Sequence, residues 1–209
     1  MAHRADADVA GDRARPGLGL AVLAPLSIEA IALRLGLRDA RVVRTGLGTQ
    51  RARAAARRLS TSADRALAVA GVCGALDPAL APGDVIVASE LLGGAGALKL
   101  ADAEALVEGV RALGARARLG AILSVDHTAR GPERERLCET GAIAIDMESR
   151  WLAEAARGRP FAVLRVVVDT PDRELLRPGV LVDGARALAT LRRIAAALET
   201  WSLGRDPLQ

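Results

Sequence analysis

The stretch Phe161-Ala-Val-Leu-Arg165-Val-Val-Val168-Asp169 is the most continuous β-branched run of the chain. A short apolar run of this kind is typical of a strand buried on both faces, as in a parallel sheet. A carboxylate such as Asp169 at the end of a buried strand costs free energy unless it is paired or put to use. The pattern therefore predicts a buried strand over 161–168 that ends in a candidate functional acid. Because Thr170-Pro171-Asp172 follows, Asp169 could instead be a helix cap or a turn former.

On the N-terminal side of this run, short apolar segments alternate with segments of helical spacing. The predicted strands cover residues 18–24, 42–43, 66–70, 85–88, 119–125 and 141–145. The predicted helices cover residues 27–35, 49–59, 101–113, 132–139, 148–156 and 183–201, and the glycine-rich stretches 71–83 and 91–100 are predicted to be loops. This alternation predicts a single α/β domain with a mixed, largely parallel central sheet flanked by helices.

The composition excludes several classes of protein. With 209 residues, 51% of them apolar, the chain can bury a sizeable core and is not a disordered chain. No apolar run reaches the roughly 20 residues that span a bilayer. The aromatic residues are Trp151, Trp201 and Phe161, with no tyrosine, which argues against a nucleic-acid binder that stacks bases on aromatic rings.

The net charge of +4 leaves room for an anionic partner or a peripheral contact with a membrane surface. The arginines, however, alternate with acidic residues along the predicted helices, as on solvated faces, and only Arg51 to Arg58 form a local cluster. Cys73 and Cys138 are too few for a disulfide framework and lack metal-ligand spacing, which fits a reducing cytoplasm. Residues 1–16 hold no apolar segment of a secretory signal and are expected to be a flexible leader to a domain over 17–209.

Small and polar residues gather where the predicted strands end. In open α/β sheets, ligands bind at the carboxyl ends of the strands, so these residues predict one polar cleft. They are Ser27 and Glu29, Thr45-Gly46, Gly71 to Gly74, Asp126-His127, Asp146 to Ser149, and Asp169.

Two of these motifs have chemical meaning of their own. In Ala144-Ile-Asp-Met-Glu148-Ser149, a carboxylate in the first turn of a helix could accept hydrogen bonds from two vicinal sugar hydroxyls, although simple helix capping explains it equally well. In Gly71-Val-Cys-Gly74-Ala-Leu, followed by Pro82-Gly-Asp84, small residues let the backbone approach a ligand closely. Cys73 reads as a small packed residue rather than a nucleophile.

Together the three motifs resemble the nucleoside phosphorylase and nucleosidase family, which includes purine and uridine phosphorylases and methylthioadenosine/S-adenosylhomocysteine nucleosidase. The resemblance runs from about Leu20 to Trp201. Gly71–Leu76 with Gly83–Val87 is similar to the family's central signature. Ile145–Ser149 is similar to its ribose-binding motif, and Arg165–Asp169 is similar to the strand that carries its catalytic aspartate. The stretches Thr140-Gly-Ala142 and Asp169-Thr-Pro-Asp-Arg173 are most similar to the hopanoid-associated phosphorylase branch.

The resemblance implies a role for each matching residue. Asp169 would be the general acid that protonates the purine N7, and Glu148 would hold the ribose 2′- and 3′-hydroxyls. Met147 would pack beneath the sugar, and Glu29 would activate a water molecule. The further residues implied in substrate binding are Asp146, Val72, Cys73, Gly74, Leu47, Asp126 and His127. Those implied in phosphate binding are Ser27, Arg44, Thr45 and Gly46.

Two departures from the family pattern concern the site, the first the acid and the sugar and the second the base. Val72 and Val168 stand where nucleosidases often have serine, which removes hydroxyls that would orient the acid or the sugar. The segment Ser124–Thr128 stands where many relatives place an aromatic residue over the purine, and none is present here. The base is therefore expected to lie against aliphatic side chains, against His127, or against a partner subunit.

The implied function is cleavage of the N-glycosidic bond of a purine nucleoside, a 5′-substituted adenosine that could carry a hopanoid. Hydrolysis and phosphorolysis both stay open: Glu29 favours water, whereas the branch with the greatest resemblance is named for phosphorolysis. No metal or organic cofactor is implied, phosphate is a possible co-substrate, and a homo-oligomer is expected. The alternatives are a catalytically degenerate nucleoside-binding protein and an arginine-rich nucleic-acid binder, of which the second is disfavoured because the arginines are dispersed.

Overall fold

The computed structural model describes residues 19–94, 96–171 and 180–204. The expected leader, residues 1–16, lies outside the described residues, as do Asp172 and Arg173. Within the described part of the chain, each helix is too short or too polar to cross a membrane.

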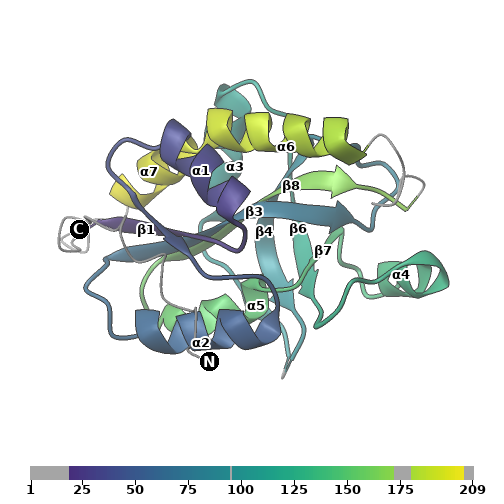
Figure 1. The fold of residues 1–209 in the computed structure, drawn as a ribbon, viewed down its shortest axis with the longest axis horizontal. Coiled ribbons are helices and arrows are strands. Elements are labelled where there is room, and N and C mark those ends of the chain that lie inside the picture. Colours follow the sequence, from purple (N-terminus) through teal and green to yellow (C-terminus); the bar gives the residue numbers. More distant parts are fainter. Residues whose placement is uncertain (1–18, 95, 172–179, 205–209) are drawn as a thin grey trace, which may run out of the picture.

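Strands and helices largely alternate along the chain, except that β3, β4 and β5 follow one another without a helix between them (Figure 1). The strands are β1 (Leu20–Ala24), β2 (Arg41–Arg44), β3 (Ala66–Ala75), β4 (Val85–Leu92), β5 (Leu98–Lys99), β6 (Ala117–Ser124), β7 (Ala144–Asp146) and β8 (Phe161–Asp169). The helices are α1 (Ser27–Gly36), α2 (Thr49–Leu59), α3 (Ala103–Ala112), α4 (Gly131–Cys138), α5 (Ser149–Leu152), the 3₁₀ turn η1 (Ala153–Ala155), α6 (Val180–Ile194) and α7 (Ala196–Leu203).

The strands form one mixed sheet in the order β2-β1-β3-β7-β6-β4-β5, with β8 paired to both β3 and β4. Among the described strands, five pairings are parallel and three are antiparallel, which confirms the largely parallel sheet expected from the sequence. The pairings β3–β8–β4–β6–β7–β3 form a closed ring. This ring explains why β8 is so uniformly apolar, since it has a strand on each side.

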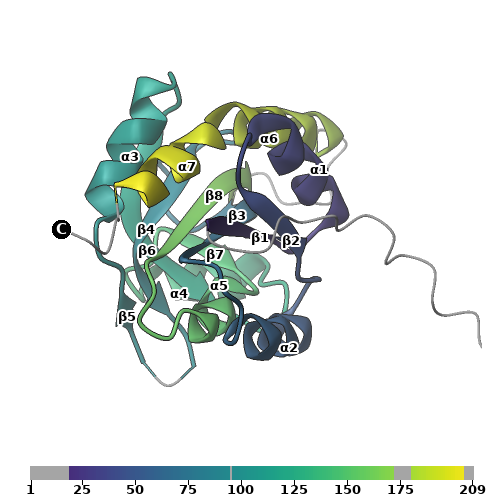
Figure 2. The ribbon, with the colours of Figure 1, turned by 90° about the vertical axis from the view of Figure 1, so that its left-hand side faces the viewer.

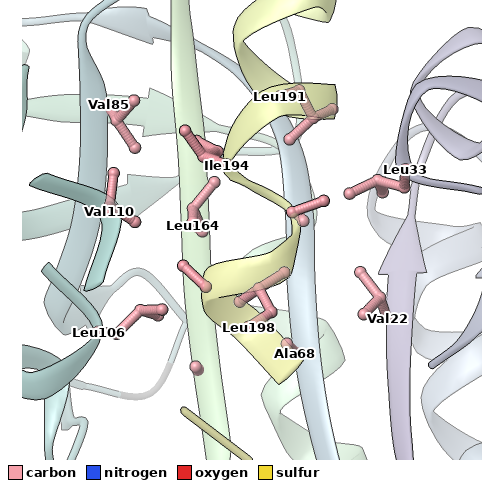
Figure 3. Close-up of a cluster of buried hydrophobic side chains, with 14 of the residues drawn as sticks. Val22, Leu33, Ala68, Val85, Leu106, Val110, Leu164, Leu191, Ile194 and Leu198 are labelled. Atoms are coloured by element: carbon pink, nitrogen blue, oxygen red, sulfur yellow. The ribbon is translucent and has the colours of Figure 1, made fainter. Parts of the chain in front are cut away.

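Apolar layers cover both faces of the sheet. Helices α1, α3, α6 and α7 lie over one face, and α2 and α5 lie over the other (Figures 1 and 2). On the first face Leu33, Leu164, Leu191, Ile194 and Leu198 pack between strands and helices with no exposed surface (Figure 3). These layers hold the strand ends in fixed positions relative to one another.

Three segments differ from the sequence prediction. The stretch from Gly71 onward is no loop: β3 continues to Ala75 because β8 and β7 supply hydrogen-bonding partners there. The glycine-rich stretch 91–100 contains the end of β4 and all of β5. The predicted helix 183–201 is two helices, because the chain turns at Ala195 and thereby keeps both Ile194 and Leu198 fully buried.

Candidate active site

A cavity of about 600 Å³ opens at the ends of the strands, within the range of roughly 300–1,000 Å³ that is usual for small-molecule sites. Its walls come from the loops after β1, β2, β6 and β7, from the ends of β3 and β8, and from α4 and α6. Most of the lining is apolar, but Glu29, Glu148 and Asp169 all reach it. Some of the strand-end residues named from the sequence thus line this cavity, among them Glu29, Glu148 and Asp169.

Glu29 joins the first helix to the central strand. It is 1% exposed, and its two carboxylate oxygens accept hydrogen bonds from the backbone N–H groups of Leu26 (2.7 Å) and Val72 (2.8 Å). Burial raises the pKa of Glu29 above its ordinary value, although Arg165 and these two N–H groups act in the opposite direction. The result is a fixed carboxylate that is a stronger base than a solvent-exposed one.

Arg165 projects from the middle of β8 and is 1% exposed. Its Nη2 atom lies 2.7 Å from Asp146 Oδ2 and 3.4 Å from Glu148 Oε2, and donates to Ser149 Oγ at 3.0 Å. Glu29 adds a third carboxylate to its electrostatic surroundings. We call Glu29, Asp146, Glu148 and Arg165 the Arg165 cluster. One buried cation thus compensates three carboxylates, a need that any buried charge has in an apolar interior.

Glu148 and Asp146 differ in how many of their acceptor positions remain available to a substrate. Glu148 accepts the N–H of Gly48 at 2.8 Å, and burial raises its pKa above the ordinary value while Arg165 lowers it. Asp146 accepts the Ser124 hydroxyl at 2.5 Å and the N–H groups of Glu148 and Ser149 at 3.2 Å each. The oxygens of Asp146 are therefore largely taken up inside the protein, so its expected contact with a substrate is secondary to holding this loop.

A second buried ion pair lies at the end of β8. Arg134, on α4, places its Nη1 atom 2.6 Å from Asp169 Oδ2 and donates twice to the carbonyl of Ala75, at 2.7 and 3.0 Å. Arg134 is 3% and Asp169 is 5% exposed. The pairing of β3 with β8 shifts by one residue after Cys73, which pairs with Val167. Gly74 therefore pairs with Asp169 and not with Val168. We call these two residues the Arg134–Asp169 pair.

The two glycines of the β3 motif are explained by these charged groups. A Cβ atom on Gly71 would lie 2.5 Å from Glu29 Oε1 and 2.8 Å from Arg165 Nη1. A Cβ atom on Gly74 would lie 2.5 Å from Arg134 Nη2 and 2.9 Å from Asp169 Oδ1. The glycines thus give room to the protein's own charged side chains, and each serves one of the two ion-paired groups.

His127 lines the cavity and contacts α4, the helix that carries Arg134. Its ring nitrogens lie 2.7 Å from Asp126 Oδ1 and 2.7 Å from Glu133 Oε1. Hydrogen bonds to these two carboxylates raise the pKa of His127 above its ordinary value. Since Glu133 precedes Arg134 on α4, His127 connects the loop after β6 to the helix that carries Arg134.

The remaining expected residues separate into two groups. Met147, Val72, Cys73, Gly74 and Leu47 line the cavity together with His127, whereas Asp126 touches it only through His127. Cys73 is buried, and this burial raises the pKa of its thiol far above the ordinary value, which agrees with a packed residue rather than a nucleophile.

The four residues expected to bind phosphate line a different cavity. Ser27, Arg44, Thr45 and Gly46 surround a second hollow of about 470 Å³, and none of them contributes to the wall of the first. The sequence placed both sets in one cleft because all of these residues stand at or near the ends of predicted strands. Within the described ranges, no group of three or more His, Cys, Asp or Glu side chains is arranged to hold a metal ion.

Sequence reasoning assigned no role to the two buried arginines. Arg165 carried a usable signal, because a charged residue inside an otherwise apolar strand needs a buried partner. Arg134 carried none: it stands in Gly131-Pro-Glu-Arg-Glu-Arg-Leu-Cys138, where alternating charges indicate a solvated helix.

No described residue lining the first cavity is Phe, Tyr or Trp. The imidazole of His127 is the ring that lines this cavity among the described residues, together with aliphatic side chains such as Val125, Ala129 and Ile145. Of the three surfaces expected against the base, aliphatic side chains and His127 line this cavity, and their contact with the base, or that of a partner subunit, stays a prediction.

Comparison with known proteins gives the class of this fold. The family description "Phosphorylase superfamily" matches residues 25–198. A methylthioadenosine/S-adenosylhomocysteine nucleosidase from Campylobacter jejuni is similar in structure, with a TM-score of 0.75 and 18% identity, over 88% of this chain and 100% of that one. An S-adenosylhomocysteine nucleosidase from Streptococcus pyogenes, in complex with 5-methylthiotubericidin, has a TM-score of 0.72 and 18% identity over 92% of this chain and 99% of that one.

A futalosine hydrolase from Helicobacter pylori is similar to the same degree, with a TM-score of 0.72 and 16% identity over 88% of this chain and 97% of that one. No protein with a curated description matches. The α/β fold is thus that of the nucleoside phosphorylases and nucleosidases, enzymes that cleave N-glycosyl bonds. The chain belongs to the phosphorylase superfamily.

Proposed function

We propose that this protein hydrolyses the N-glycosidic bond of a purine nucleoside, a 5′-substituted adenosine. The observation that carries the proposal is that Glu29, Glu148 and Asp169 line one cavity of about 600 Å³. Bond cleavage at C1′ needs three things: a hold on the sugar, a proton for the departing base, and a nucleophile on the opposite face of the sugar. Each of the three carboxylates supplies one of them.

Glu148 holds the ribose. One of its oxygens accepts the N–H of Gly48 and the other faces Arg165, so the carboxylate has a fixed orientation. Vicinal hydroxyl groups donate to such an acceptor, and Met147, in the wall beside Glu148, packs against the sugar ring. Burial of the Glu148 carboxylate raises its pKa because the charged form loses its hydration. A hydroxyl group of the sugar that donates to this carboxylate compensates part of that loss.

Asp169, in its protonated carboxylic-acid form, gives its proton to the base, and Arg134 stabilises the carboxylate charge that remains. After the transfer Asp169 is a carboxylate, and the guanidinium of Arg134, 2.6 Å away, stabilises it. An arginine cannot itself supply the proton, because it stays protonated in proteins. Arg134 is therefore a positioning residue for Asp169 in this mechanism.

Glu29 activates the water molecule. Its raised pKa suits a general base, and the hydrogen bonds from Leu26 and Val72 fix its direction. Water is favoured over phosphate because the residues expected to bind phosphate line the second cavity, whereas Glu29 lines the first.

The substituent at the 5′ position is proposed to be apolar. Leu26, Ile28 and Leu47 line the cavity, and Ile28 is 56% and Leu47 48% exposed, so the apolar wall continues to the surface. A hopanoid-linked nucleoside has an extended apolar group of this kind. Its burial against these side chains would contribute affinity at roughly 25 cal/mol per Å² of apolar surface.

The test is release of the free base from adenosine and from 5′-alkyl-substituted adenosines, measured with and without phosphate. Equal rates in both buffers are expected, and a rate that requires phosphate would show phosphorolysis instead. Glu29→Gln should slow hydrolysis by about 10²–10⁴-fold, the usual contribution of a general base. Glu104→Gln, an exposed change of the same kind on α3, is the matched control.

A second candidate is a protein that binds a nucleoside without cleaving it. It is favoured by the ion pair between Arg134 and Asp169, because a carboxylate in such a pair has no proton to give, and by valine at positions 72 and 168 in the cavity wall. Asp169→Asn distinguishes the two candidates. An enzyme loses base release while it still binds nucleoside, whereas a binding protein shows no base release before or after the change.

A further inference from the structure

Exposed apolar side chains gather at the opening of the first cavity. Ile28 and Leu47 line this cavity and are 56% and 48% exposed. Ile31 and Leu35 follow Ile28 along α1 and are 54% and 62% exposed. Single apolar side chains on a surface are ordinary, but a contiguous group of them marks a contact site. We call Ile28, Ile31, Leu35 and Leu47 the α1 patch.

Helix α1 is apolar on two of its sides. Ile28, Ile31 and Leu35 have the spacing i, i+3, i+7, which places them in one stripe along the helix. Ala30 and Leu33, on another side, are buried in the core between the helix and the sheet. Packing of the helix on the sheet accounts for the buried side and leaves the exposed stripe without a structural reason.

The other large apolar side chains that are exposed in the described ranges are Val182, Leu113 and Leu203. Val182 stands two residues before Gly184, which lines the first cavity. Leu113 follows the end of α3, and Leu203 is the last residue of α7. The apolar exposure is thus concentrated near the cavity opening, and the last two residues provide a comparison away from it.

Arginines border the α1 patch at the C-terminal end of the helix. Arg34 lies three residues after Ile31, so the two side chains are neighbours on the helix surface. Arg38 follows two residues after the end of the helix. Both arginines are exposed.

Helix α6 adds two more arginines at the same place. It lies alongside α1 (Figures 1 and 2), and a Cβ atom on Gly36 would overlap the carbonyl oxygen of Arg192. Arg192 and Arg193, in the last turn of α6, are exposed. In α1, the turn after it and the described side chains of α6, the carboxylates that are not buried are Asp39 and Asp183. This surface therefore has an excess of positive charge.

An apolar stripe bordered by arginines has the chemistry of a surface that rests on a lipid bilayer. The apolar side chains enter the boundary between headgroups and acyl chains, and the arginines reach anionic headgroups over their long apolar stems. A second copy of this chain fits the surface less well, because its own α1 patch would bring the same excess of positive charge to the contact.

We propose that the α1 patch, with Arg34, Arg38, Arg192 and Arg193, docks the protein on an anionic lipid bilayer with the cavity opening turned toward the membrane. Because Ile28 and Leu47 belong to both the patch and the cavity wall, docking makes the apolar wall continuous with the acyl chains. A substrate with an apolar group then passes from the lipid into the cavity without exposing that group to water. This entry route rests on the proposed function, whereas the docking itself does not.

Flotation with lipid vesicles measures the docking directly. At low salt the full chain should bind vesicles made of equal parts phosphatidylglycerol and phosphatidylcholine at least about tenfold more tightly than vesicles of phosphatidylcholine alone. Binding to the anionic vesicles should weaken as salt is added, because salt screens the attraction between arginines and headgroups.

Ile31→Gln/Leu35→Gln tests the apolar part of the surface. Both side chains are exposed, so the helix keeps its packing on the sheet, and unfolding temperatures check that it does. Leu113→Gln/Leu203→Gln, the same change at the two exposed leucines away from the cavity, is the matched control. The first variant should bind anionic vesicles at least about tenfold more weakly, and the control should bind them as the unchanged protein does.

Arg34→Gln/Arg38→Gln tests the charged part. Arg57→Gln/Arg136→Gln removes the same charge from exposed positions on α2 and α4 and is the matched control. Binding to anionic vesicles should fall about tenfold for the first variant and less than about twofold for the control.

Three outcomes would overturn the proposal. The first is that the unchanged protein does not bind anionic vesicles at low salt, and the second is that test and control variants lose binding equally, as general charge attraction would cause. The third is that Ile31→Gln/Leu35→Gln separates an oligomer in sedimentation but leaves vesicle binding unchanged, which would make the patch an interface between copies. Failure of the proposed cleavage would be seen separately, as no release of adenine from adenosine in buffer without vesicles, and would leave the vesicle result intact.

Discussion

The Arg165 cluster and the Arg134–Asp169 pair both compensate carboxylates that are buried at the wall of the cavity, but they do so from different parts of the fold. Arg165 lies in the middle of β8, between two neighbouring strands, and is surrounded by three carboxylates. Arg134 lies on α4, which Figure 1 shows at the edge of the molecule, away from both helix layers. The first arginine is part of the core of the sheet, and the second is brought in by a peripheral helix.

Because of this difference, Arg165 is expected to matter more for the stability of the fold and Arg134 more for the position of Asp169. Loss of Arg165 leaves several buried charges without compensation inside the sheet, which the whole fold would feel. Loss of Arg134 leaves one carboxylate at the end of a strand, beside a single peripheral helix rather than inside the sheet. The part of the cavity that holds the sugar is therefore expected to be rigid, and the part that meets the base is expected to vary more readily.

The largest effect is expected from Arg165→Met. Removing one partner of a buried ion pair costs about 3–5 kcal/mol, and here Asp146, Glu148 and Glu29 all lose their cation. The free energy of unfolding, measured with urea, should fall by this amount. Arg165→Lys keeps the charge but loses the planar fork, so an intermediate loss is expected. Equal stability of the methionine variant and the unchanged protein would remove the distinction between the two arginines.

Arg134→Met should affect catalysis more than stability. Asp169 loses its ion pair and the carbonyl of Ala75 loses its donor, which costs roughly 1–3 kcal/mol of unfolding free energy. A misplaced Asp169 slows base release by up to about 10²-fold, in kcat rather than in KM. Arg136→Met, exposed on the same helix, is the control. A loss confined to KM would show that Arg134 binds substrate and does not position Asp169.

The glycines of β3 give a direct comparison of the two ends of the cavity. Gly71→Ala would press a methyl group against Glu29 and Arg165, both held in the core, at a cost of about 1–3 kcal/mol in unfolding free energy. Gly74→Ala meets the end of the Arg134 side chain, which can shift with α4, so a smaller loss is expected. A larger loss for Gly74→Ala than for Gly71→Ala would contradict the view that the Arg134 end is the adjustable one.

The smallest effect is expected from His127→Gln. Because the pKa of His127 is raised in the folded protein, its contacts with Asp126 and Glu133 contribute stability below the ordinary histidine pKa, and this contribution is lost as pH rises through the folded value. The unfolding temperature of the unchanged protein should therefore fall slightly as pH rises through neutral values, relative to the unfolding temperature of the variant. Identical pH profiles would show that His127 does not secure α4.

Much of the fold could be predicted because its signals are local. The alternation of apolar runs with helical spacing defines most elements, and residues at several strand ends lie at the same end of the sheet because the sheet is largely parallel. The errors occurred where tertiary pairing decided the outcome, as in β3, which continues through Gly71 only because β8 and β7 lie alongside it. Glycine there indicated a loop, whereas its actual reason is the closeness of Arg165 and Arg134.

The sequence by itself determined the strand that ends in Asp169, the Met147-Glu148 motif after β7, and Glu29 at the start of α1, because each depends on a short stretch of chain. Only the tertiary structure decided that Asp169 is paired with Arg134, 35 residues earlier, and that Glu148 reaches Gly48, 100 residues earlier. It also divided the expected cleft into two cavities. No local pattern encodes such distances, since which charges meet across a fold is set by how the sheet closes and how the helices pack on it.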